Sequence, residues 1–211
     1  MTMNPIAKAI GLSACLLFAA GLAGCRIHVE KDATGDKKNV QVDTPFGGIH
    51  VNTDQTTAAD IGLPVYPGAQ VARDHEDDKS ADVHLGFGDW ELRVKVVNYT
   101  APDAQDKVVA FYKNALGRYG AVLTCQDNVP VGTPTQTADG LTCVDDWRNH
   151  NVTVDTGGFK TGRGGFQLRA GSVRHQHIVG FESSGDGQTR FALVALDLPS
   201  ADSGSSDKKS N

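Results

Sequence analysis

The chain has 211 residues, of which 39% are hydrophobic, 21% charged and 7% aromatic. This composition is typical of one globular domain, or two small ones, and it excludes a disordered or collagen-like protein. The formal net charge of −5 argues against a nucleic-acid-binding protein with a basic surface. After the N-terminal segment, no apolar run approaches the roughly 18 residues that a membrane-spanning helix needs, which excludes a polytopic membrane protein.

Residues 1–24 have the layout of an export signal. A short polar stretch with one lysine precedes the apolar segment AIGLSACLLFAAG, which has the length of a signal-peptide core. The segment ends in LAGC at 22–25, which resembles the lipobox of bacterial lipoproteins. The resemblance implies cleavage between Gly24 and Cys25 and acylation of the Cys25 sulfur and amine. An ordinary secretory signal followed by a chance cysteine is the alternative.

This N-terminus predicts both a membrane anchor and a location. Several acyl chains anchor a protein much more strongly than one, because each buried CH₂ contributes about 0.8 kcal/mol. We therefore expect a lipid anchor at Cys25 in the cell envelope, with the folded part facing the periplasm. In enterobacterial lipoproteins an Asp after the cysteine favours the inner membrane; Arg26 stands there in this chain, which favours the outer membrane.

The remaining cysteines predict a disulfide. Cys15 leaves with the signal peptide and Cys25 is acylated, so Cys125 and Cys143 are left in an oxidising compartment. Their bond would close a polar loop of about 18 residues and stabilise the fold by roughly 3 kcal/mol. A redox pair or a pair of metal ligands is the alternative, although the chain contains no CxxC motif.

Two segments precede the predicted main domain. Residues 25–36 are polar and predict a tether, which would reach roughly 36 Å when fully extended. Residues 37–55 alternate apolar and polar side chains on both sides of the turn sequence TPFGG, which predicts a β-hairpin. An isolated hairpin is marginally stable, so we expect it to pack on the main domain or to pair with another chain.

The main domain is expected over residues 61–198. Alternation over 82–97 predicts a hairpin with one buried and one solvated face, and helical spacing over 108–119 predicts an amphipathic helix. Residues 199–211 lack large apolar side chains and predict a disordered tail. Further strands are expected at 121–125, 141–147, 166–181 and 190–198, the last of them covered on both faces.

These elements predict an α+β fold class. We expect an antiparallel sheet of several strands packed against one main amphipathic helix, with an N-terminal β-hairpin.

Four strings resemble a group of uncharacterised bacterial lipoproteins: VQVDTPFGGIHV, GLPVYPGA, VVAFYKNALGRYGAVLTC and FALVALDLP. In that group a YPGA-type turn precedes a helix with an FY…L…G pattern, within a small α+β domain. The resemblance covers residues 38–199 and carries no established activity, so it implies no catalytic or binding residue. It implies architectural roles for Pro67, Gly68, Phe111, Tyr112 and Leu116.

Few residues carry a chemical signal, and no GxSxG, HExxH, Walker-type or dinucleotide motif occurs. His175 and His177 are the candidate metal ligands, because residues two apart in a strand point the same way and two imidazoles bind zinc or copper when a third ligand converges. Structural or surface histidines are the favoured interpretation. Candidate third ligands are Asp145, Asp146 and His150.

Three other features favour a plain structural interpretation. The glycine-rich stretch 155–165 lacks the strand-to-helix context of a phosphate-binding loop, which favours a hairpin tip. The acidic run 74–78 lacks EF-hand spacing, which favours a solvated loop. Asp145 and Asp146 are adjacent, so in a strand they would face opposite ways and could not act together on one atom.

The sequence predicts a lipid-anchored bacterial cell-envelope protein with a non-enzymatic, structural or protein-interaction role. Its expected partners are the membrane, through the anchor, and another envelope protein, with no nucleic acid and no cofactor. A periplasmic binding module for a small ligand or a metal ion is the alternative, and an enzyme is the third hypothesis.

Overall fold

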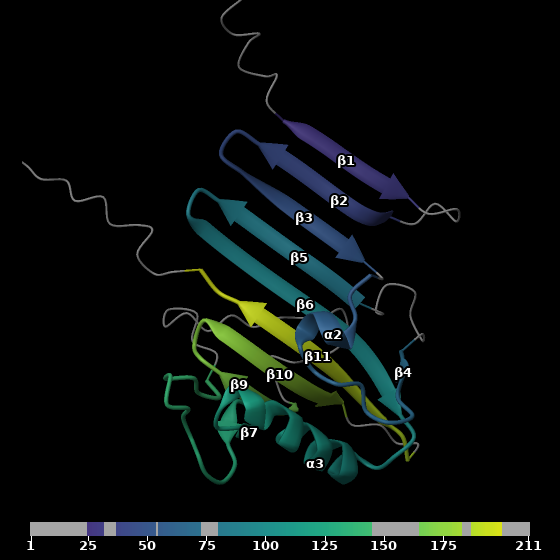
Figure 1. Cartoon of the computed structure of the whole chain (residues 1–211), viewed down its shortest axis with the longest axis vertical. Helices are drawn as coiled ribbons and strands as arrows, with labels where there is room; N and C mark the ends of the chain where they lie inside the picture. The colour runs from purple at the N-terminus through teal and green to yellow at the C-terminus, as the bar shows by residue number, and fades with distance from the viewer. Residues whose placement is uncertain are drawn as a thin grey trace, which may run out of the picture.

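The computed structural model describes residues 25–31, 37–53, 55–72, 80–144, 165–182 and 187–199. Within these ranges the chain forms an 11-stranded antiparallel sheet with short helices packed on one face (Figure 1). The predicted signal peptide and all but the first residue of the predicted tail lie outside the described residues.

The sheet has the strand order β1-β2-β3-β5-β6-β11-β10-β9-β7-β8, and β4 pairs with β6. The helices are α2 (Ala58–Ile61), α3 (Gln105–Leu116) and the 3₁₀ turn η1 (Gly117–Tyr119). The strands are β1 (Arg26–Lys31), β2 (Lys37–Thr44), β3 (Gly47–Thr53), β4 (Gln70–Val71), β5 (Ser80–Phe87), β6 (Trp90–Ala101), β7 (Leu123–Gln126), β8 (Val129–Pro130), β9 (Phe166–Gly171), β10 (His175–Glu182) and β11 (Thr189–Asp197).

The predicted α+β fold class was wrong, because the described chain is mostly antiparallel β. Strands make up 53% and helices 14% of the structure. A helix does form where helical spacing was found, but α3 has only 12 residues and α2 has 4. We expected residues 25–55 to lie outside the main domain. Their strands instead pair with those of the main domain in one continuous sheet, so strands make up most of the described chain.

The predicted tether was also wrong over residues 26–31. These residues form β1, which pairs antiparallel with β2 and sets Ile27 opposite Val42 and Val29 opposite Val40. Apolar and polar residues alternate in RIHVEK as they do in β2, so the segment fits a strand with one apolar and one polar face. The sheet therefore begins at the residue after Cys25.

The predicted disulfide was confirmed. Cys125 and Cys143 are bonded with their Cα atoms 5.6 Å apart, and both are buried beside Leu123 and Leu141. The expected strand at 141–147 was wrong over its described part, 141–144, where only Thr142 makes a β-bridge, to Gln136. The disulfide and the hydrogen bonds between Leu141 and Thr137 hold this segment instead of a strand ladder.

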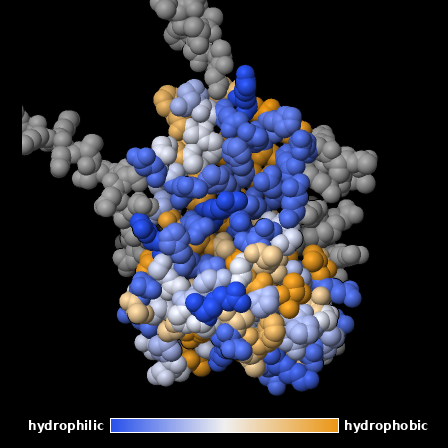
Figure 2. All heavy atoms as spheres, in the orientation of Figure 1, coloured by the Kyte–Doolittle hydropathy of each residue, from blue (hydrophilic) through white to orange (hydrophobic). Residues whose placement is uncertain are grey.

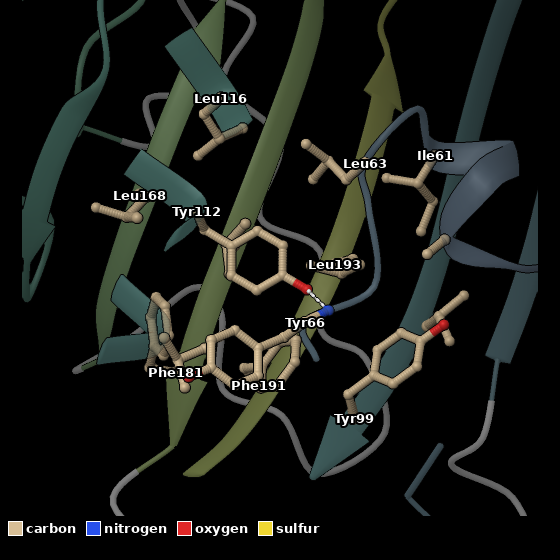
Figure 3. Packing of buried hydrophobic residues seen from close by; sticks show 14 of the residues in the cluster. Ile61, Leu63, Tyr66, Tyr99, Tyr112, Leu116, Leu168, Phe181, Phe191 and Leu193 are labelled. Atoms are coloured by element: carbon tan, nitrogen blue, oxygen red, sulfur yellow. Dashed lines mark hydrogen bonds between the residues drawn. The ribbon is translucent and has the colours of Figure 1, made fainter. Parts of the chain in front are cut away.

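The main core lies between α3 and the sheet (Figure 3). Val108, Tyr112 and Leu116 form the buried stripe of α3. They pack against Phe191 and Leu193 of β11. The alternate residues of β11 are buried in a second cluster, which confirms that this strand is covered on both faces.

The hydroxyl of Tyr112 ties α3 to the segment after α2. It donates to the Pro64 carbonyl oxygen (3.1 Å) and accepts from the Tyr66 backbone N–H (3.2 Å; Figure 3). Burial raises the pKa of this hydroxyl, which therefore stays protonated and able to donate. Phe111 packs edge-on against Tyr66, with ring centroids 5.2 Å apart.

We predict that Tyr112→Phe will lower the free energy of unfolding by about 1–3 kcal/mol, because the Tyr66 N–H and the Pro64 carbonyl lose their shared partner in a buried region. Urea denaturation followed by circular dichroism measures this. Tyr66→Phe is the control: the carboxylate of Asp103 would keep its contact with Lys107, so its loss should stay below about 1 kcal/mol. Equal losses in both variants would contradict the prediction.

Candidate functional site

The two histidines expected to form a site lie on the same side of β10 but contact different partners. The ring of His177 stacks on Tyr119 of η1, with ring centroids 3.6 Å apart. The Nδ1 atom of His175 lies 2.8 Å from Oδ1 of Asp197 on β11. The strand geometry was therefore correct, but the two imidazoles do not converge on one point.

A metal centre is not preassembled in the part of the chain that the structure describes. No group of three or more His, Cys, Asp or Glu side chains there is arranged to hold a metal ion. The candidate third ligands Asp145, Asp146 and His150 lie outside the described residues, as do the acidic run 74–78 and all but the last residue of the stretch 155–165.

His177 occupies a structural position between the sheet and the helical layer. The Tyr119 hydroxyl donates to the Gly62 carbonyl oxygen at 2.6 Å, so the ring that covers His177 is held in place. Burial lowers the pKa of His177, and a hydrogen bond to the Ile61 backbone opposes this only in part. Among the described residues its Nδ1 atom has no hydrogen-bond partner, so the neutral ring suits this position.

The sheet register brings together a different set of histidines. Neighbouring members of one cross-strand row lie directly opposite each other from β1 to β10. Four of the seven members are histidines from four different strands. We call this set the histidine row: His28, Gln41, His50, His84, Arg93, Asp197 and His175.

Each histidine of the row lies beside a carboxylate. Nitrogen–oxygen distances are 2.8 Å for His84–Glu91 and for His175–Asp197, 3.2 Å for His50–Asp43 and 3.5 Å for His28–Glu30. The His84–Glu91 contact has ion-pair distance without hydrogen-bond geometry. The four histidine side chains are between 39% and 70% exposed, so the row faces solvent, although the Nε2 atom of His84 is itself buried.

The centre of the row is the pair His50 and His84, whose ring centroids are 6.1 Å apart. Next to this pair, Arg93 donates two hydrogen bonds to Asp82, of 3.2 and 2.8 Å, and these bonds raise the pKa of the guanidinium. Figure 2 shows that the face over β1 to β6 is mostly hydrophilic. The row therefore offers imidazole nitrogens and carboxylate oxygens side by side to a polar ligand or a cation.

Sequence reasoning missed this row because it depends on register. Alternation alone places His50 on the polar face of its strand and His84 on the polar face of another. Their direct opposition requires the pairing of β3 with β5, which are separated by α2, β4 and a long connection. One signal in the sequence could have found the pair: each of the two predicted hairpins, 37–55 and 82–97, has a histidine at a polar position of one strand.

Comparisons with family models, with curated proteins and with solved structures found no match to this chain. The resemblance to bacterial lipoproteins therefore remains a prediction.

The lowered pKa of His177 predicts a pH dependence of stability. The pKa of His177 is 6.5 in the unfolded chain and lower in the folded chain. At a pH between these two pKa values, the unfolded chain binds a proton on His177 that the folded chain does not. The free energy of unfolding should therefore fall as pH drops below about 6.5, and level off once the folded ring is protonated. His177→Gln should reduce this slope.

Urea midpoints between pH 5 and 7.5 measure the effect. The charged groups that act on His177 are Asp197, Arg118 and His175, so their residues stay unchanged in both proteins. An identical slope in the variant would contradict the prediction.

Proposed function

We propose that this chain is a lipid-anchored protein of the bacterial cell envelope, attached through acylated Cys25. The observation that carries the proposal is the sequence LAGC at 22–25, which follows an apolar segment of signal-peptide length. Cys25 is an exposed free thiol, and the bonded pair Cys125–Cys143 suits an oxidising compartment. The folded part faces the periplasm, and Arg26 after the cysteine favours the outer membrane.

We propose a non-enzymatic role in which the polar face of the sheet binds another envelope protein. This face carries exposed charges of both signs at fixed positions, because each lies on a paired strand. Arg93 is held by two hydrogen bonds to Asp82, so a partner with complementary charges would meet a preorganised pair at this position. The histidine row lies within this face.

We predict that Cys25→Ser will remove the protein from the membrane fraction, with about a tenfold or greater fall in the pelleted share, because the acyl chains supply the anchoring energy. Fractionation of cells, combined with intact mass of the purified protein, measures both location and acylation. Cys15→Ser is the matched control, since that residue leaves with the signal peptide. Membrane association and acylated mass that survive in Cys25→Ser would refute the anchor.

A periplasmic binding module for a metal ion or small ligand is the second candidate function, favoured by the direct opposition of His50 and His84. A tetrahedral zinc ion with ordinary bond lengths would hold two imidazole centres about 5 Å apart, close to the observed 6.1 Å. Asp43 and Glu91 would have to turn from their present contacts to complete the site.

Zinc or copper should then raise the Tm of the wild-type protein in a saturable way, because a ligand of the folded state stabilises it. His50→Ala combined with His84→Ala should abolish the shift, whereas His175→Ala should retain it. No shift with either metal, or a shift lost only in His175→Ala, would exclude this pair as the site.

A further inference from the structure

One end of the sheet gathers exposed apolar side chains around Cys25. Arg26 pairs with Asp43, so Cys25 lies at the end where β2 turns into β3. The pairs Gly47–Phe87 and Phe87–Trp90 place the turn from β5 to β6 at the same end. Figure 1 shows the start of β1 and both turns along one side of the sheet.

The side chains at this end are large and open to solvent. Phe46, in the first turn, is 84% exposed, and Phe87 is 46% exposed. Trp90 is partly exposed and lies against Phe87, with ring centroids 5.9 Å apart. Ile27, two residues after Cys25, is 70% exposed. We call this set the aromatic end: Ile27, Phe46, Phe87 and Trp90.

The distance from Cys25 to the sheet leaves no room for a linker. Arg26 is already the first paired residue of β1, so one residue, or about 3.5 Å of chain, separates the cysteine from the fold. If Cys25 carries acyl chains, as the proposed function states, this end of the sheet is held at the bilayer surface. Its exposed rings then lie at the depth where Trp and other apolar side chains are favoured.

The described charges around this end would not attract it to anionic lipid headgroups. Among the residues that the structure describes here, Arg26 is the exposed cation, and Asp43, Asp89 and Glu91 are the neighbouring anions. Since anions outnumber the cation among the described residues at this end, attraction to anionic headgroups does not explain contact of these residues with the membrane. Burial of apolar side chains remains as the driving force.

We propose that the aromatic end is a membrane-docking surface, which rests in the interfacial layer of the bilayer beside the acylated Cys25. The inference rests on the proposed lipid anchor and adds a second, non-covalent contact to it. Docking by both contacts orients the sheet, so that the histidine row and the polar face lie at a constant height above the membrane.

Depth-dependent quenching of Trp90 tests the docking. The full chain with Trp147→Phe is produced in a bacterium, extracted from membranes and reconstituted in phosphatidylcholine vesicles, with and without brominated acyl chains. We expect about twofold or stronger quenching of Trp90 by the brominated lipid, because an interfacial indole contacts the upper acyl chains. Phe46→Ser should weaken the quenching, whereas Val131→Ser, at an exposed apolar position next to the opposite edge strand β8, should leave it unchanged.

A tryptophan at the other edge of the sheet is the matched control. Val129 is 60% exposed on β8, the outermost strand opposite β1. In Val129→Trp, with Trp90 and Trp147 both replaced by Phe, brominated lipid should not quench the fluorescence. Equal quenching at both positions would overturn the proposal, since it would show contact without orientation.

The outcomes separate docking from anchoring. An acylated mass together with an unquenched Trp90 would overturn the docking and leave the anchor in place. A mass without acyl chains would overturn the anchor and the docking together. The Trp90 fluorescence could instead change with the density of protein in the vesicles, whether or not the lipid is brominated. That result would overturn the docking and assign the aromatic end to contact with a second copy of the chain. Quenching that disappears in high salt would also overturn the proposal, because apolar burial does not depend on screened charges.

Discussion

The long strand β6 determines how the rest of the molecule is organised. It pairs with β5 from Trp90 to Val97 and with β11 from Arg93 to Ala101, so five consecutive residues are paired on both sides. This overlap joins the N-terminal strands to the strands that carry the main core. Without it, β1, β2, β3 and β5 would be a separate sheet that lacks the main core, and the histidine row would be divided between two bodies.

Continuous pairing also explains why one sheet has two kinds of surface. Strict alternation in the N-terminal strands sends His50 and His84 to the polar face and Ile49 and Leu85 to the opposite face. Alternation stops in β11, where residues of both parities are buried. The polar face and the aromatic end therefore both belong to the part of the sheet that α3 does not cover, and the structural core belongs to the other part.

Local patterns could be predicted from the sequence, whereas pairing between distant segments could not. The buried stripe of α3, the two-sided burial of β11 and the disulfide follow from spacing, composition and cysteine arithmetic. The fold class and the tether were wrong, because a polar segment such as RIHVEK becomes a strand only when a neighbour supplies its hydrogen bonds. The surroundings of His177 could not be predicted for the same reason: the orientation of its side chain was foreseeable, but the ring of Tyr119 that covers it comes from another element.

The replacement of the expected tether by β1 changes what a lipid anchor would accomplish. A flexible segment reaching roughly 36 Å would let the domain sample every orientation above the membrane. With the proposed anchor, a strand that starts one residue after Cys25 would instead confine the domain to the membrane surface and restrict its rotation. A partner of the polar face would then have to lie close to the same membrane, because that face begins on β1 and extends only as far as the sheet does. Confinement of this kind would raise the effective concentration of a membrane-bound partner without any added contact, so the proposed anchor and the proposed binding face would act together.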